Sequence, residues 1–213
     1  MMFSELLKWK GFSGGYLLFG WSALKIATIP LYLAFVTNPL ILEGVIELSM
    51  LGDCLLLTIV IILMAEQEKR ANHFQQVLGE CHPAGIWLWK LLVLALLLVC
   101  SSLILWTSVG LVRNSLSQFL QIALVVLSLE IWLSHAHLFF ALFLSRTVNL
   151  LLAFLDCLVL VFASNHVFEG WYCFPTALSI NAMFGDSLAL HWSLAWSGLA
   201  LLTQLGYVAW KGR

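Results

Sequence analysis

The sequence predicts an all-α, polytopic membrane protein with six transmembrane helices, and three observations lead to this fold class. Hydrophobic residues make up 62% of the 213 residues and charged residues only 10%, whereas an average soluble domain is roughly 45–50% apolar and about 25% charged. The mean hydropathy is +0.99. The apolar runs are continuous and about 20 residues long, which suits helices that cross a bilayer and does not suit the alternating strands of a barrel.

Six apolar runs fit helices that cross the membrane. We place them at residues 14–36, 46–65, 86–110, 116–135, 147–164 and 189–210. The first run ends at Thr37-Asn38-Pro39, because proline and the residue before it disfavour helix. No small-residue cleavage site closes this run early, so we interpret it as a span and not as a signal peptide. We expect one membrane domain over residues 1–213.

The basic residues outside the spans predict an orientation. With six spans both termini share one side, and that side holds Lys8, Lys10, Lys69, Arg70, Lys90, Arg146, Lys211 and Arg213. The opposite side holds Arg113 alone. Because short loops rich in Lys and Arg stay in the cytoplasm, we expect both termini to be cytoplasmic. The net charge of −1 and the absence of a basic patch in the sequence give no reason to expect a nucleic-acid partner.

Three polar segments outside the spans are candidate functional regions. Residues 1–12 mix Phe, Leu and Trp with Lys, as an interfacial amphipathic helix does. Residues 67–84 carry sparse apolar residues at helical spacing, which predicts a short cytoplasmic helix: Ala71, Phe74, Val77 and Leu78. This helix either docks into a soluble partner or is an ordinary polar connector. Residues 165–188 form a mixed segment on the outer side.

Four ionisable residues lie inside the expected spans: Lys25, Asp53, Glu130 and Asp156. Such residues are expensive in lipid and usually face the bundle interior, which makes each one a candidate site that contacts cargo. A structural role is the alternative for each. Lys25 can reach a headgroup region with its long side chain, and Glu130 and Asp156 can pair with Arg146, His135 or His137.

Signatures of catalysis and of metal binding are weak. The sequence has no GxSxG, HExxH or Walker A pattern. His135 and His137 point about 200° apart on a helix, so one metal ion does not easily take both. Glu66 and Glu68 only faintly resemble the adjacent glutamates of intramembrane prenyl-protein proteases. The five cysteines show no ligand spacing. We expect no enzyme activity and no bound metal or cofactor.

The region from the second to the third expected span resembles ABC-2-type transporter permeases. It reads LMAEQEKRANHFQQVLGECHPAGIWLWKLL. In that family an acidic residue ends the second span, a short cytoplasmic helix and a stretch ending in Pro follow, and a Lys begins the third span. The matching positions here are Glu66 and Glu68, residues 71–79, Pro83 and Lys90.

The later sequence is similar to the same family, and most of all to the small permeases of lantibiotic (bacteriocin) immunity transporters. Leu142–Ser145 with Asn149 is similar to the family's "LFLS" turn. Trp171 to Pro175 is similar to an outer aromatic-Pro segment, which often forms short re-entrant helices. His82 and Lys25 depart from the pattern and leave the subgroup and the cargo open.

The resemblance implies the type V exporter-like permease fold and a role as half of a transmembrane pore in the bacterial plasma membrane. ATP and Mg²⁺ would bind a separate ABC ATPase subunit, and a second permease, identical or different, would complete the pore. The implied ATPase-coupling residues are Glu66, Glu68, Lys69, Arg70, Ala71, Phe74, Val77, Leu78 and Pro83. The implied cargo-facing residues are Trp171, Tyr172, Phe174 and Pro175. The implied cargo is an antimicrobial peptide removed from the outer leaflet.

Three other functions remain open at this point. One is an ABC-2 exporter for a lipid, a glycan or a drug. Another is a stand-alone membrane interaction protein, in which residues 71–78 would tolerate charge reversal. The third is an intramembrane enzyme, which would be active as the purified chain alone.

Overall fold

The computed structural model describes residues 12–36, 38–70 and 83–211. Within these ranges the secondary structure is helical, with turns and no strand. The helices are α2 (Ser13–Phe35), α3 (Pro39–Arg70), α5 (Pro83–Val112), α6 (Leu116–Phe143), α7 (Arg146–Ser164), α8 (Pro175–Met183) and α9 (Ser187–Lys211). Five of them, α2, α3, α5, α6 and α7, are long and apolar enough to cross a membrane. The chain is therefore a multi-pass α-helical membrane protein.

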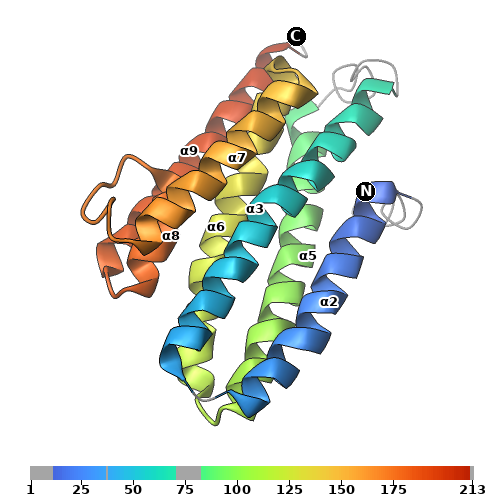
Figure 1. Cartoon of the computed structure of the whole chain (residues 1–213). Helices are drawn as coiled ribbons and strands as arrows, with labels where there is room; N and C mark the ends of the chain where they lie inside the picture. The colour runs from blue at the N-terminus through green and yellow to red at the C-terminus, as the bar shows by residue number, and fades with distance from the viewer. Residues whose placement is uncertain (1–11, 37, 71–82, 212–213) are drawn as a thin grey trace.

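The long helices run up and down the bundle, as Figure 1 shows. The start of α2, the end of α3, the start of α5 and the α6–α7 turn all lie toward its upper end in that view. We call this the charged end, because Glu66, Glu68, Lys69, Lys90 and Arg146 belong to it. The α2–α3 and α5–α6 connections lie at the opposite end.

Helix α6 occupies the centre of the molecule. It contacts α3, α5, α7, α8 and α9, and its buried side chains run from Phe119 to Ala141. Near the opposite end the ring of Phe119 stacks on Trp106 of α5, with ring centroids 6.4 Å apart. Polar side chains on α6 therefore lie between neighbouring helices, and this position determines the candidate sites described below.

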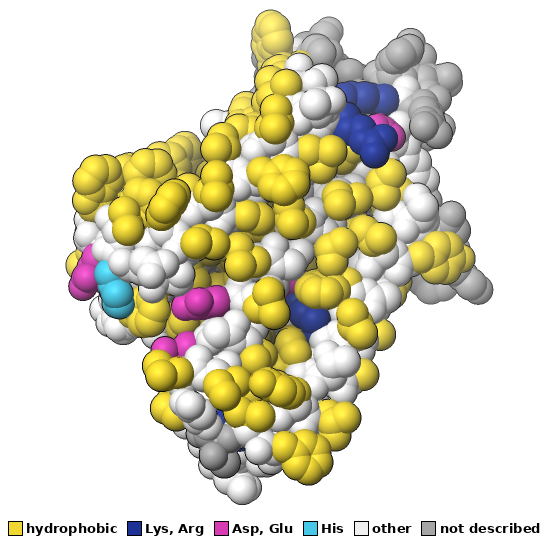
Figure 2. Space-filling view, viewed as in Figure 1, with side chains coloured by type: hydrophobic (Ala, Val, Ile, Leu, Met, Phe, Trp, Pro, Cys, Tyr) yellow, Lys and Arg dark blue, Asp and Glu magenta, His cyan; other side chains and the backbone are white. Residues whose placement is uncertain are grey.

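The outer surface of the bundle is apolar, as a membrane requires. On α7 the exposed large side chains recur at helical spacing: Leu151, Phe154, Leu155, Leu158, Val161 and Phe162. Figure 2 shows that hydrophobic side chains cover most of the face over α2, α3 and α7. A group of Lys and Arg side chains lies near the upper end of this face. The large apolar patch agrees with a surface that contacts lipid.

The helix ends follow from local signals. Pro39 begins α3, where a missing N–H costs nothing, and the Asn38 side chain accepts a hydrogen bond from the Leu40 N–H at 3.0 Å. The Ser145 hydroxyl similarly accepts a bond from the Val148 N–H at 3.4 Å and caps α7. Helix α3 is longer than the expected span 46–65 at both ends. The reason is that the helix starts directly at the proline and continues through the charged residues.

Candidate functional site

The charged end is held together by ion pairs between helices. Lys90 of α5 donates a hydrogen bond to Glu68 of α3, and both side chains are largely buried. Arg146, at the start of α7, lies 3.8 Å from Glu66, measured from Nη1 to Oε1. These contacts connect both helices that flank residues 71–82 and extend to the α6–α7 turn. They give Glu68 and Glu66, which the sequence singled out, the basic partners Lys90 and Arg146.

A pocket of about 160 Å³ lies beside these ion pairs. Glu66 and Lys69 of α3 line one side, and Ser145 and Arg146 line the other. Asn149 also lines this pocket. Charges of both signs therefore line this pocket, on helices that the ion pairs connect.

Lys25, Asp53 and Glu130 form a buried cluster between α2, α3 and α6. The Lys25 Nζ atom donates to both carboxylate oxygens of Asp53, at 2.7 and 2.9 Å. The Trp21 indole N–H donates to Asp53 Oδ1 at 2.7 Å. Glu130 Oε1 lies 3.7 Å from Nζ. All three charged residues are at most 6% exposed, so Lys25 does not extend to a headgroup region and Glu130 does not pair with Arg146.

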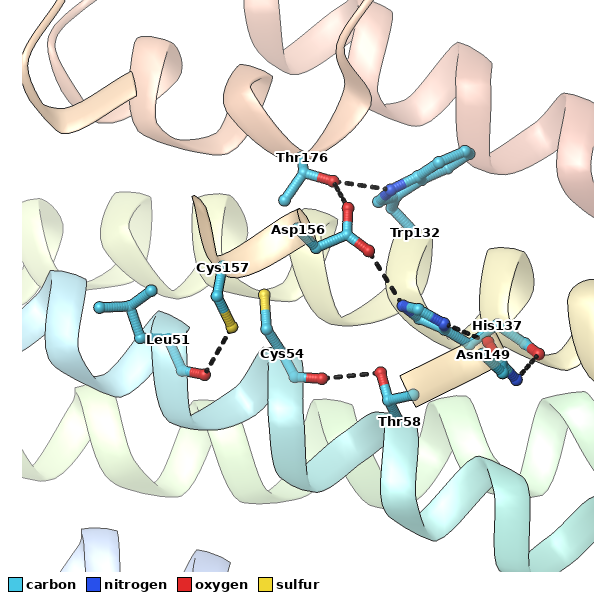
Figure 3. Close-up of polar contacts among 9 residues, drawn as sticks. All are labelled: Leu51, Cys54, Thr58, Trp132, His137, Asn149, Asp156, Cys157 and Thr176. Carbon is cyan, nitrogen blue, oxygen red and sulfur yellow. Dashed lines mark hydrogen bonds and ion pairs between the residues drawn. The ribbon is translucent and has the colours of Figure 1, made fainter. Parts of the chain in front are cut away.

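His137 is the centre of a second network, which links α6, α7 and α8 (Figure 3). Its Nδ1 lies 2.7 Å from Asn149 Oδ1 and its Nε2 lies 3.1 Å from Asp156 Oδ2. Asn149 Nδ2 donates to the His137 carbonyl at 3.0 Å, which fixes the amide oxygen toward the ring. Asn149 Oδ1 can only accept a hydrogen bond, so His137 Nδ1 is the donor of this contact and carries N–H.

The same network reaches the short helix α8. Thr176 donates to Asp156 Oδ1, and the Trp132 indole donates to Thr176 Oγ1 at 3.3 Å. Asn149 lines the pocket at the charged end, whereas Thr176 belongs to α8, which lies within residues 165–188. A continuous run of hydrogen bonds therefore connects the charged end to α8.

Gln204 of α9 forms a third group of polar contacts, with α5 and α6. Its amide N–H₂ donates to the His135 carbonyl, and its oxygen accepts from the Trp87 indole at 3.2 Å. The His135 ring is buried, and its Nδ1 has no hydrogen-bond partner in the part of the chain that the structure describes. His135 and His137 therefore do not share a ligand. Within the described ranges, no group of three His, Cys, Asp or Glu residues is arranged to hold a metal ion.

Aromatic rings gather in the segment directly before α8. Trp171 stacks on Phe174 with centroids 6.1 Å apart, and Phe168 lies 4.8 Å from Phe174. Tyr172 instead stacks on Trp192 and donates to the Asp186 carboxylate at 3.0 Å. This hydrogen bond raises the pKa of the Tyr172 phenol above its usual value. Pro175 is the first residue of α8.

The sequence analysis named Asn149 only through its resemblance to a family turn, and it missed two other members of these networks. Thr176 sits within an apolar stretch, and Gln204 is an isolated amide within α9. A systematic search for lone amides and hydroxyls in apolar runs would have found them, but not their partners. The expected interfacial helix at residues 1–12 lies, except for Phe12, outside the described residues, and so do Ala71, Phe74, Val77 and Leu78. For Arg70 and Pro83 the structure describes only the backbone.

Comparisons with known proteins found no counterpart. No family model matches the chain, and neither a curated protein nor a solved structure matches it.

Proposed function

We propose that this chain is the transmembrane permease subunit of an ATP-driven ABC-type transporter. The observation that carries the proposal is that ion pairs join the two helices that flank residues 71–82 to each other and to α7. We call these ion pairs the clamp. Glu68 bonds to Lys90 across α3 and α5, and Glu66 lies near Arg146 at the start of α7. A push on the segment between α3 and α5 would therefore move three helices together, as closure of an ATPase dimer requires.

The length of α3 supports contact with a soluble partner. Its 32 residues span about 48 Å at roughly 1.5 Å per residue, whereas the hydrocarbon core is about 30 Å thick. The residues from Glu66 to Arg70 belong to the excess length at the charged end. This end of the helix would stand above the hydrocarbon core, where an ATPase subunit binds.

We propose α9 as a sixth span. Its 25 residues reach about 38 Å, which is enough to cross. Its most polar interior side chain, Gln204, is buried and hydrogen-bonded to α5 and α6, so it does not meet lipid. With six spans both termini would lie on the charged side, which we propose is the cytoplasmic side of a bacterial plasma membrane because it is rich in Lys and Arg.

We further propose an amphipathic cargo such as an antimicrobial peptide. A groove of about 480 Å³ lies between α2 and α3. Apolar residues such as Leu24, Ile29 and Leu48 line it, together with Lys25 and Tyr32. The exposed Trp171 adds an aromatic surface before α8. A second permease subunit would close the pore. Lipid, glycan or drug cargoes are alternatives. The functions of the neighbouring genes would distinguish these cargo classes.

The first test is to purify the chain in mild detergent, identify the proteins that co-purify with it, and assay the sample for ATPase activity. An ATPase subunit is expected to co-purify, and changing Phe74 and Leu78 to Asp is expected to remove it. Glu169→Gln is the control, because Glu169 is exposed and far from the charged end. Cells that lose the chain should become more sensitive to the peptide. A chain that purifies alone from cells known to express the neighbouring ATPase would overturn the proposal.

A charge swap tests the clamp itself. Glu68→Lys places two ammonium groups together and should reduce cargo-stimulated ATP hydrolysis while ATPase binding persists. The double variant Glu68→Lys with Lys90→Glu restores opposite charges and should recover most of the stimulation. If the single variant keeps full stimulation, the ion pair does not transmit the movement.

A further inference from the structure

The buried Lys25 cluster has one cation and two carboxyl groups. Lys25, Asp53 and Glu130 come from α2, α3 and α6, and each is nearly inaccessible. If both carboxyl groups were ionised, the cluster would hold one unbalanced negative charge. An isolated buried carboxylate is so costly that such a group takes up a proton instead. One of the two carboxyl groups must therefore be neutral, or another cation must be present.

The hydrogen bonds show which carboxyl group is ionised. Asp53 accepts three bonds, two from Lys25 and one from Trp21, all between 2.7 and 2.9 Å. Three hydrogen bonds to one carboxylate, from two donor groups, stabilise its charged form. Glu130 has only the longer approach of Oε1 to Lys25 at 3.7 Å. Its Oε2 is buried and has no hydrogen-bond partner among the described residues, which is the expected place for a proton.

The space beside Glu130 limits what can bind there. The cavity that it shares with Lys25 and Asp53 measures about 10 Å³, and Ser22 and Ser101 also line it. This volume is close to the minimum that one water molecule needs. An organic cation does not fit, and the ammonium of Lys25 already takes the position between the two carboxyl groups. We propose that Glu130 is a proton-binding site, neutral in the folded protein and buried within the helix bundle.

The groups around this site determine its response to pH. Lys25 from α2 and Asp53 from α3 are the charged groups that act on Glu130 among the described residues, and α5 contributes the uncharged Ser101. Loss of the proton adds a second negative charge beside Asp53. The contact between α6 and the α2–α3 pair then weakens. The inference concerns the chain alone and does not depend on the proposed transport function.

Infrared spectroscopy of the purified full-length chain, with glutamate carboxyl groups labelled with ¹³C, tests the proposal. At neutral pH the labelled wild type should show the C=O stretch of a protonated glutamic acid. Glu130→Gln should abolish this band, and Glu66→Gln, near the charged end, should leave it. Asp53→Asn should also abolish it, because Lys25 then has only Glu130 to pair with. Thermal unfolding should shift to lower temperature as pH rises in the wild type and not in Glu130→Gln.

Two outcomes would overturn the proposal. If the spectrum of Glu130→Gln equals that of the wild type, Glu130 is ionised in the folded chain. If the band is lost at constant pH when sodium replaces choline in the buffer, the site takes a metal cation in preference to a proton. Because no ATPase takes part, failure of this experiment leaves the transporter proposal unaffected.

Discussion

Lys25 is the only cation that the structure places beside Asp53, among the residues described. Removing it by Lys25→Met leaves a buried carboxylate with the Trp21 indole as its remaining donor. Breaking a buried ion pair in this way costs about 3–5 kcal/mol. The double variant Lys25→Met with Asp53→Asn removes both charges and should recover most of that loss. Thermal unfolding in detergent measures the stability of the single and the double variant. A double variant as unstable as the single one would contradict the pairing of Lys25 with Asp53.

Two histidines on one helix allow a matched comparison. His137 is fully buried with both ring nitrogens bonded, whereas the buried His135 ring has an unpartnered Nδ1. His137→Leu leaves Asn149 and Asp156 without their partner, and we expect a loss of about 1–3 kcal/mol. His135→Leu should be close to neutral, because Gln204 bonds to the backbone carbonyl and not to the ring. Equal losses in unfolding temperature would show that the network contributes nothing specific.

At the scale of the helices, Gly52 permits the close approach of α2 to α3. A Cβ at this position would lie 2.5 Å from the Trp21 ring, so Gly52→Ala displaces the indole that bonds to Asp53. Gly44→Ala on the same helix meets no atom within 4 Å and should stabilise by about 0.5–1 kcal/mol, since alanine favours helix. We therefore expect Gly52→Ala to lower the unfolding temperature and Gly44→Ala to raise it. Truncating Trp21 to Leu should abolish the penalty at position 52.

Helices were predictable to the extent that their signals are local. Apolar runs and the break at Asn38-Pro39 indicated the five spanning helices. The short helix α8 was not assigned from its own residues, because Trp171 to Met183 mixes polar, aromatic and small residues without a clear period. The pairing of Lys25 with Asp53 depends on how α2 and α3 are rotated toward each other, and no local pattern encodes that rotation. The same holds for His137 and Asp156.

At the scale of the whole molecule, the uneven distribution of Lys and Arg predicts the orientation in the membrane. The charged end carries the α6–α7 turn at Ser145, and the opposite end carries the α5–α6 turn at Asn114. Because positive residues remain in the cytoplasm, Ser145 should face inward and Asn114 outward. A single cysteine introduced at each position, with the native cysteines replaced by alanine, reports this with a membrane-impermeant maleimide.

Intact cells should label the Asn114→Cys variant, whereas Ser145→Cys should react only after the membrane is opened. Both positions are exposed and belong to short turns between long helices, so a difference in labelling between them reports sidedness. The reverse pattern would place Glu66, Glu68, Lys90 and Arg146 outside the cell. No cytoplasmic ATPase could then reach the clamped ends of α3 and α5, and the transport mechanism proposed for this chain would have no source of energy. Orientation is therefore the property of the whole molecule on which that mechanism depends.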